Sequence, residues 1–298
     1  MAVTMMRQEL TANLTGFADT SEPCAIRELV RADEEEVLEF LSARPVHTVF
    51  MAGLIRDNTL VSPQNRGSFY GSRTRSGQLE GVALIGHATM IEAHTEDSLA
   101  GFARVARNCH NAHLIRGEQS SIQPFWQCFA GAGQVPRLVC REYLFELKEL
   151  TAEVESSINL RPATIEDIDK IMAVNSSMAF EEGGVSPSRR DPSGFRNRTA
   201  RRIEKGRIWV MFDENRLVFK TDVVSETPDV TYLEGVYVHP EERRKGHGLR
   251  CLRKLSSMLM DRSRSICLTV NQSNKNAIAL YNKAGYKLHS NYETIYLR

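Results

Sequence analysis

The stretch that most constrains this chain runs from Val236 to Gly248, where an apolar segment passes through a short basic turn into a helix. A strand, a turn and a helix in this order leave several backbone N–H groups unpaired at the positive end of the helix dipole. Gly246 and Gly248 lie in the turn, and residues without a Cβ allow unusual backbone angles and the close approach of a ligand. The stretch therefore predicts an anion site, and a phosphate or pyrophosphate suits it best. The helical spacing after the turn is carried by Leu249, Leu252, Leu255 and Leu259.

The spacing of this turn separates it from two other phosphate-binding loops. It lacks the three glycines of the dinucleotide fingerprint and the Gly-Lys-Ser/Thr of a Walker loop. Arg243-x-x-Gly246-x-Gly248 instead resembles the acyl-CoA pyrophosphate loop of the GNAT superfamily (GCN5-related N-acetyltransferases), whose pattern is Gln/Arg-x-x-Gly-x-Gly/Ala. The resemblance implies that the CoA phosphates are held, mainly through backbone N–H groups, by Arg243, Arg244, Lys245, Gly246, His247, Gly248 and Leu249.

The segments on both sides of the turn extend the resemblance. Tyr232 to Val238 is similar to the family's fourth strand, which splays from the fifth so that pantetheine amides can pair with it. Ser265 to Val270 is similar to that fifth strand, and Asn274 to Tyr286 resembles the family's Asn, short helix ending in Tyr, Gly and aromatic residue. The resemblance thus implies further contacts with the CoA arm from Val236, Tyr237, Val238, Asn274 and Tyr281.

The order of the predicted elements gives the domain organisation. Residues 158–298 read as strand, two helices, three strands, helix, strand, helix and strands, which is the GNAT order. Residues 25–146 repeat that order, but they have no glycine-bearing turn before Glu96 and no Asn…Tyr segment near Ser120. We therefore expect an α/β (α+β) protein of two tandem GNAT-like domains, each a mixed, mostly antiparallel sheet flanked by helices. Residues 1–150 would form a degenerate, non-catalytic domain and residues 151–298 the catalytic, acetyl-CoA-binding one, with the boundary in the polar stretch 149–157.

The chemistry of acyl transfer assigns roles to a few residues. The attacking amine must lose a proton, the oxyanion needs an N–H donor, and the leaving thiolate benefits from a proton. Tyr281 matches the family's general-acid tyrosine; the alternative is a tyrosine that only packs beneath the loop. Glu234 resembles the Glu of a Glu-Gly-x-x-Val pattern in some small-molecule members and is the candidate base; the alternative is a strand glutamate paired with an arginine. Val236 or a near neighbour would supply the oxyanion donor, and Thr269 stands where several peptide N-terminal acetyltransferases carry a Glu.

Composition excludes several other classes of protein. The formal net charge of +1 argues against a dedicated nucleic-acid surface. No apolar run approaches membrane-spanning length, and Met1 to Thr20 lacks a signal-peptide core. The scattered cysteines indicate reduced thiols, so we expect a cytoplasmic protein. His110-x-x-His113 could suggest a metal, but we expect a surface or core role for these histidines and no metal site.

A basic segment bears on acceptor specificity. Arginines and one lysine concentrate between Arg189 and Arg207, where the family builds its acceptor rim. They could attract an acidic acceptor or the CoA phosphates, or they could be a solvated helix face paired with local acids.

Three functions remain open from the sequence. The first is an acetyl-CoA-dependent N-acetyltransferase acting on a small amine or an amino-acid-like molecule. The second is a protein or peptide N-acetyltransferase, and the third is a non-catalytic acyl-CoA sensor. Tyr281 and Glu234 favour catalysis over sensing. The acceptor, the length of the acyl group and the oligomeric state cannot be read from the residues, but we expect the first domain to form one wall of the acceptor site.

Overall fold

The computed structural model describes residues 25–131, 133–150 and 157–298, so Met1 to Thr20, Cys24 and most of the expected domain boundary lie outside the described residues. The first half contains β1 (Ala25–Glu28), α1 (Glu34–Ser42), α2 (Pro45–Asn58), β2 (Gly67–Arg73), β3 (Leu79–Gly86), β4 (Ala88–Ala93), α3 (Glu96–Ala106), β5 (Leu114–Glu118), α4 (Gln119–Ala130) and β6 (Leu138–Leu147). The second half contains β7 (Arg161–Pro162), α5 (Ile168–Gly183), α6 (Pro187–Arg190), α7 (Pro192–Glu204), β8 (Ile208–Asp213), β9 (Arg216–Glu226), β10 (Val230–Val238), α8 (His247–Met260), β11 (Ser265–Asn271), α9 (Lys275–Ala284) and β12 (Lys287–Tyr296).

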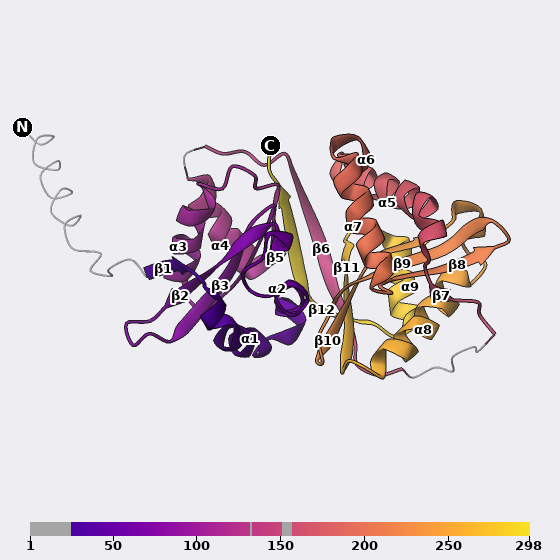
Figure 1. The fold of residues 1–298 in the computed structure, drawn as a ribbon, viewed down its shortest axis with the longest axis horizontal. Helices are drawn as coiled ribbons and strands as arrows, with labels where there is room; N and C mark the ends of the chain where they lie inside the picture. Colours follow the sequence, from indigo (N-terminus) through magenta and orange to yellow (C-terminus); the bar gives the residue numbers. More distant parts are fainter. Residues whose placement is uncertain (1–24, 132, 151–156) are drawn as a thin grey trace, which may run out of the picture.

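The two halves share one sheet because they exchange their last strands. Over the described residues the strand order is β1-β2-β3-β4-β5-β12-β6-β11-β10-β9-β8-β7. Strand β6 of the first half pairs antiparallel with β11, and β12 of the second half pairs antiparallel with β5 and β6. Figure 1 shows these central strands lying between two lobes of helices and strands. Each lobe is therefore completed by a strand from the other half. The domain boundary near residue 150 stays a prediction.

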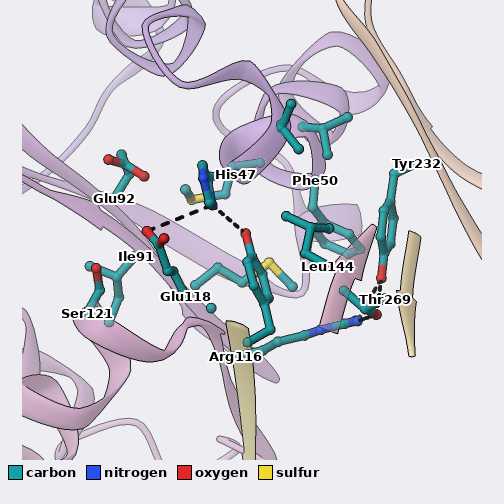
Figure 2. Close-up of a pocket in the computed structure, with 16 residues that line it drawn as sticks. His47, Phe50, Ile91, Glu92, Arg116, Glu118, Ser121, Leu144, Tyr232 and Thr269 are labelled. Atoms are coloured by element: carbon teal, nitrogen blue, oxygen red, sulfur yellow. Dashed lines mark hydrogen bonds and ion pairs between the residues drawn. The ribbon is translucent and has the colours of Figure 1, made fainter. Parts of the chain in front are cut away.

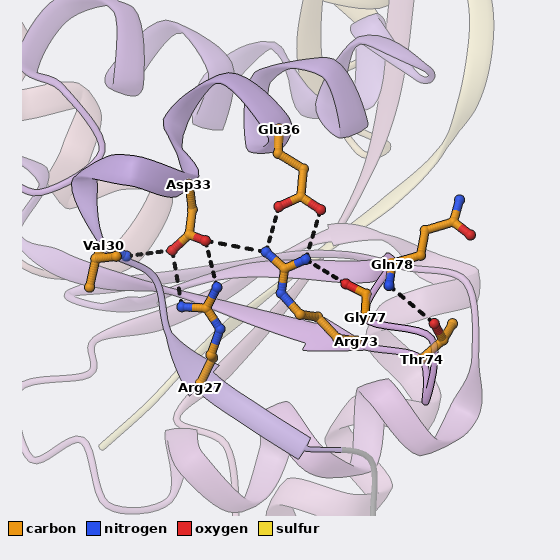
Figure 3. Close-up of polar contacts among 8 residues, drawn as sticks. All are labelled: Arg27, Val30, Asp33, Glu36, Arg73, Thr74, Gly77 and Gln78. Carbon is orange, nitrogen blue, oxygen red and sulfur yellow. Dashed lines mark hydrogen bonds and ion pairs between the residues drawn. The ribbon is translucent and has the colours of Figure 1, made fainter.

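A repeated ion pair supports the duplication that the element order predicts. In the first half, Asp33 accepts from Arg27 at 3.0 Å and from the backbone N–H of Val30 at 2.8 Å (Figure 3). In the second half, Asp167 accepts from Arg161 at 2.7 Å and from the backbone N–H of Thr164 at 2.8 Å. Both sets have the same spacing of arginine, amide and aspartate at the entry to the first helix, so the halves begin with the same local structure.

Three segments differ from what their residues predict. The apolar spacing of residues 33–58 predicts one helix, but the segment is divided into α1 and α2, because Pro45 starts a new helix at its first position. The Gly, Pro and Ser residues of 183–194 predict irregular structure, but the segment contains α6 and the start of α7. The sequence predicts a closing strand from Tyr292, and the strand begins earlier, at Lys287.

The strands of the second half splay where the sequence predicts it. β10 and β11 pair in parallel only from Val230 to Leu233, although β10 continues to Val238. The register between β10 and β9 also shifts between Glu234 and Tyr237, and Gly235 has a φ of 63°. The peptide between Gly235 and Val236 therefore lies outside both ladders. On the neighbouring helix α8, Leu252, Leu255 and Leu259 are fully buried, as their spacing predicts.

Within the three described ranges, none of the helices combines the length and the apolar character needed to cross a membrane.

The strand exchange predicts that a residue near the C-terminus stabilises the first half. Ile295 on β12 is 1% exposed and packs in the core of the first lobe with Ile115 and Phe125. Ile295→Ala should therefore lower the free energy of unfolding by about 3 kcal/mol. It should also speed hydrogen exchange of the β5 amides.

Leu288 on the same strand is 56% exposed and provides the control. Leu288→Ala should change stability by less than about 0.5 kcal/mol. Unchanged exchange of β5 in Ile295→Ala would contradict the structural role of the exchanged strand.

Candidate active site

The phosphate turn has the backbone geometry that an anion requires. Arg244 and Gly246 both have left-handed backbones, with φ values of 64° and 86°. Helix α8 then begins at His247 with no side-chain cap. Alternation of left- and right-handed residues makes successive N–H groups converge, and an uncapped helix N-terminus adds further donors. The residues present therefore fit a phosphate group of CoA.

The side chains of the turn contribute less charge than the sequence suggests. Arg243 donates Nε to the Val238 carbonyl at 3.1 Å, and Lys245 pairs with Glu242 at 3.0 Å. His247 lies 3.5 Å from the same carboxylate. Among the described residues, Arg244 alone of the turn's cationic side chains has no such partner. The cradle is consequently made mainly of backbone donors.

The corresponding helix of the first half is unsuited to a phosphate. The Thr95 hydroxyl accepts from the backbone N–H of Ser98 at 3.2 Å and so caps α3. Glu96 and Asp97 add negative charge to the first turn of that helix. These carboxylates already occupy the place where the dipole favours an anion, and they would repel a phosphate. This contrast gives a physical reason for the degeneracy predicted for the first half.

A buried lysine supports the irregular part of β10. Lys220 is 1% exposed, and its ammonium group lies 3.4 Å from the Gly235 carbonyl oxygen. It also donates to Asn175 at 2.5 Å and pairs with Asp222 at 2.9 Å. Because the C=O and N–H of a trans peptide point in opposite directions, the N–H of Val236 points away from Lys220. That N–H is thus available outside the strand ladders, as expected for an oxyanion donor.

Tyr281 lies in the core at the base of the splay. It is 6% exposed, and its ring centroid is 6.2 Å from those of Phe145 and Tyr286. Burial raises the pKa of Tyr281, so the hydroxyl keeps its proton at neutral pH. A packing role and a proton-donor role are both compatible with this position. Asn274, expected on the CoA arm, accepts from the Ala277 N–H at 3.1 Å and caps α9.

Glu234 is paired with an arginine, and the arginine comes from the first half. Arg116 on β5 donates to the Glu234 carboxylate at 3.1 Å, and the glutamate side chain is 44% exposed. The same guanidinium lies 3.6 Å from Glu142, donates to the Tyr232 hydroxyl at 2.6 Å and donates to Thr269. Glu234 is thus a strand glutamate paired with an arginine, which is one of the two alternatives. The sequence did not identify Arg116 as the partner.

The first half also contacts the segment that follows α5. Arg137 donates to the Gly183 carbonyl at 2.6 Å, and Arg190 lies 3.5 Å from His113. Together with Arg116, these contacts bring the first half against Glu234 and against the segment from Gly183 to Gly194. Its position agrees with the expected wall of an acceptor site, while that role stays a prediction.

Most of the basic segment from Arg189 to Arg207 is neutralised locally. Its ion pairs join Arg196 to Asp169 at 2.6 Å, Arg198 to Asp191 at 3.0 Å, Arg202 to Asp222 at 3.4 Å, and Arg207 to Asp57. This arrangement favours the interpretation of a helix face paired with nearby acids. Arg207 and Asp57 also join the two halves.

Sequence patterns missed one acidic residue, Glu182 in the last turn of α5. Burial and the negative charges of Glu234 and Glu142 raise the pKa of Glu182 to about 7. No motif marks this position, because the shift arises from residues that are distant in the sequence. Arg116 could not have been found either, since it belongs to the half without site motifs.

A pocket lined in part by Arg116 lies between the halves, and Figure 2 shows its lining residues. It lies where β4 and β5 move apart, because these two strands pair only at Ala88 and Thr89 of β4. His47 contacts the Tyr292 hydroxyl at 3.0 Å and His289 at 3.3 Å. Burial lowers the pKa of His47 to about 4, so its ring is neutral. These side chains form hydrogen bonds with one another, which indicates a structural network.

The described ranges hold no group of three or more His, Cys, Asp or Glu side chains placed to bind a metal. His113 instead stacks on His87 with ring centroids 5.1 Å apart.

Comparisons with known proteins agree with the motifs and with the fold. Residues 223–295 match the family model described as FR47-like protein. A Drosophila protein of known structure aligns over 92% of this chain and 99% of its own, with 13% identity and a TM-score of 0.66. A GCN5-related N-acetyltransferase from Sphaerobacter thermophilus aligns over 92% of this chain and 95% of its own, with 16% identity and a TM-score of 0.57. The chain therefore has the GNAT fold, and residues 223–295 resemble the FR47-like family.

The duplicated architecture of this chain also has a counterpart among solved structures. A tandem GNAT protein from the clavulanic acid biosynthesis pathway aligns over 91% of this chain and 98% of its own, with 15% identity and a TM-score of 0.54. A search of curated proteins gave no match. The predicted fold class, two tandem GNAT-like domains, is therefore confirmed.

The central position of Arg116 predicts a large effect of its removal. Arg116→Met would leave the Glu142 and Glu234 carboxylates beside a partly buried hydroxyl cluster without their cation. Breaking such a pair on one side should lower the free energy of unfolding by about 3 kcal/mol, measured by urea denaturation.

The control is Arg141→Met, which removes an exposed arginine from strand β6. It should change stability by less than about 0.5 kcal/mol. Equal effects of the two substitutions would show that the Arg116 cluster contributes nothing specific.

Proposed function

We propose that this protein is an acetyl-CoA-dependent N-acetyltransferase whose acceptor is a small amine or an amino-acid-like molecule. The observation that carries the proposal is the splay of β10 and β11, together with the uncapped start of α8 and the Tyr281 side chain, which shares a core cluster with Val236 and Leu268. An acyl thioester bound there would have its phosphates at the helix N-terminus and its carbonyl near the free peptide of Val236.

In this proposal each of the candidate site residues has a defined task. The turn from Arg243 to Leu249 binds the CoA phosphates, and the edge of Val236 to Val238 pairs with the pantetheine amides. The Val236 N–H stabilises the oxyanion as the amine attacks. Tyr281 gives its proton to the leaving sulfur, because its raised pKa keeps it protonated until the thiolate forms.

The charge around the acceptor position favours a cationic molecule. The carboxylates of Glu142 and Glu234 share a single guanidinium, that of Arg116. Excess negative charge attracts an ammonium group and disfavours an anion at the same place. This field supports an amine acceptor rather than an acidic one.

The two other functions make different predictions. For peptide acetylation, Thr269 would have to leave its contacts with Tyr232 and Arg116 if it were to take part in the chemistry. A sensor would bind CoA without turnover. Release of free thiol from acetyl-CoA, measured against a panel of amines, amino acids and peptides, distinguishes the three.

The phosphate turn can be tested by adding a side chain to its left-handed glycine. Gly246→Val should lower CoA affinity tenfold or more in calorimetry, because a bulky side chain disturbs the cradle and removes charge-assisted hydrogen bonds of about 1.5–3 kcal/mol.

Gly206→Val is the control, since Gly206 also has a positive φ, of 64°, but lies in the turn between α7 and β8. It should be comparably strained and bind CoA normally. Similar loss of affinity in both variants would mean that Gly246 acts only through folding.

A proton-donor role of Tyr281 can be tested by measuring its effect on kcat and on CoA affinity separately. Tyr281→Phe should reduce kcat on the order of 100-fold with little change in CoA affinity, because a proton donor acts in the transition state. Tyr286→Phe removes another buried hydroxyl, which bonds to Ser256 at 2.9 Å, and should leave kcat nearly unchanged. Equal kcat values in wild type and Tyr281→Phe would assign Tyr281 to packing alone.

A further inference from the structure

Lys220 on β9 is a buried cation that contacts the peptide group of the proposed oxyanion donor. Its side chain is 1% exposed, and its ammonium group lies 3.4 Å from the Gly235 carbonyl oxygen, in the peptide group whose N–H belongs to Val236. We infer that Lys220 is a positioning residue that polarises this peptide group and so strengthens the Val236 N–H as the donor to the oxyanion. The inference rests on the proposed N-acetyltransferase function, and it assigns a role to a residue outside the GNAT motifs.

Strand β10 has a bulge at this peptide group. Between the pairs on either side, two residues of β10, Gly235 and Val236, lie opposite one residue of β9, Thr221. The side chains agree with the register, because Leu233 and Val236 contact the same core cluster although they are three positions apart. In a regular strand, residues at that spacing face opposite sides of the sheet. The bulge thus follows directly after Leu233, the last residue of β10 that pairs with β11.

Gly235 allows the cation to reach the backbone of the bulge. Its φ of 63° lies in the left-handed region, which favours glycine. A Cβ added at this position would also lie only 2.7 Å from the Lys220 ammonium nitrogen. The cation therefore packs directly against the peptide group, and no side chain separates the two.

The orientation of the peptide group places the cation and the donor at opposite ends. The described residues contain no cis peptide bonds, and the C=O and N–H of a trans peptide point in opposite directions. Because the Gly235 carbonyl faces a side chain of β9, the Val236 N–H points to the other side, where β11 has separated from β10. A positive charge at the carbonyl oxygen draws electron density toward it and makes the N–H a stronger donor.

The surroundings of Lys220 hold its ammonium group and leave an excess of positive charge. The group donates to Asn175 on α5 at 2.5 Å and pairs with Asp222 at 2.9 Å. Asp222 also pairs with Arg202 at 3.4 Å, so that one carboxylate serves two cations. These three charges together carry a formal excess of one positive charge beside the Gly235 carbonyl.

Stability alone does not account for a buried ion pair at this place. Taking two charges out of water costs free energy that their attraction repays only in part, and apolar residues of similar size often stabilise a fold as well or better. Strand β9 nevertheless has Lys220, Thr221 and Asp222 in succession, with exposures of 1%, 0% and 4%. Thr221 donates to the Glu234 carbonyl at 3.1 Å, so polar groups of this row support both carbonyls of the bulge. Departures from ordinary packing rules of this kind are expected at functional sites.

The test compares two substitutions that break the same ion pair, using an amine that the thiol-release assay identifies as an acceptor. Lys220→Gln removes the cation, whereas Asp222→Asn removes the carboxylate and keeps the cation. Lys220→Gln should lower kcat about tenfold, less than the 100-fold or more that loss of a whole oxyanion donor costs. Asp222→Asn should lower kcat less than about twofold, because the charge at the carbonyl remains. CoA affinity, measured by calorimetry, should be unchanged in both variants.

Equal losses of kcat in the two variants would overturn the inference, because the ion pair would then serve only the fold. If Lys220→Gln does not fold, the double variant Lys220→Gln/Asp222→Asn replaces it, since removing both partners leaves no unpaired buried charge. Its kcat should be about tenfold below that of Asp222→Asn, from which it differs only at Lys220.

A spectroscopic measurement reads the polarisation without turnover. The infrared stretch of the thioester carbonyl, in acetyl-CoA labelled at that carbon, should move to lower frequency when the molecule binds to the wild type. The shift should be smaller in Lys220→Gln and should be retained in Asp222→Asn. An equal shift in the wild type and in Lys220→Gln would contradict the role given to the lysine.

The matched control is Ser225→Ala on the same strand. Ser225 is 2% exposed and donates to the Val49 carbonyl at 2.6 Å, so the substitution removes another buried donor to a backbone carbonyl. It should leave kcat and the carbonyl shift unchanged. Losses as large as those of Lys220→Gln would show that any weakening of β9 has this effect, and would overturn the inference.

The outcomes separate this inference from the function on which it rests. Turnover with the same kcat and the same carbonyl shift in Lys220→Gln would overturn the role of Lys220 and leave the N-acetyltransferase intact. CoA binding without turnover on any amine would overturn the proposed function. The carbonyl shift would then still decide whether Lys220 polarises the peptide group.

Discussion

The exchange of β6 and β12 is the constraint on which the rest of the structure depends. Because β12 pairs with β5 and β6 pairs with β11, residues of both halves lie side by side across the central sheet. The register places Arg116 opposite Thr294 on β12 and Glu142 opposite Asn271 on β11. A one-residue slip would turn every one of these side chains to the other face. The position of Arg116 beside Glu234 is therefore a result of strand pairing.

The two halves have the same topology but opposite electrostatics at the helix that follows the splay. Helix α8 presents uncapped donors after left-handed Arg244 and Gly246, whereas α3 is capped by Thr95 and begins with Glu96 and Asp97. A helix dipole favours an anion by about 0.3–1 kcal/mol at an exposed terminus, so two carboxylates are enough to reverse the preference. Few substitutions are thus needed to turn a CoA-binding fold into one that cannot hold a phosphate.

Sequence reasoning predicted the parts of the protein that depend on local chemistry. The glycine turn, the leucine stripe of α8 and the order of elements follow from spacing, and so does the position of Tyr281. The strand exchange could not be predicted, since β6 and β12 have the same alternation whichever sheet edge they join. The repeated pair of Arg27 with Asp33 and Arg161 with Asp167 was present in the sequence, but its role became visible only through the shared amide contact. Glu182 has no local signature, because its raised pKa is caused by burial and by charged neighbours on four strands.

The ion pairs of Arg116 join the two halves at the candidate site. Arg116 stands on β5 of the first half and donates to Glu234 on β10 of the second at 3.1 Å, and it also donates to Thr269 on β11. The position of β5 depends on its pairing with β12, so folding of the first half decides whether Glu234 has its cation. The exchange of strands thus makes the first half part of the candidate site, although its own helix α3 is capped and acidic at the N-terminus.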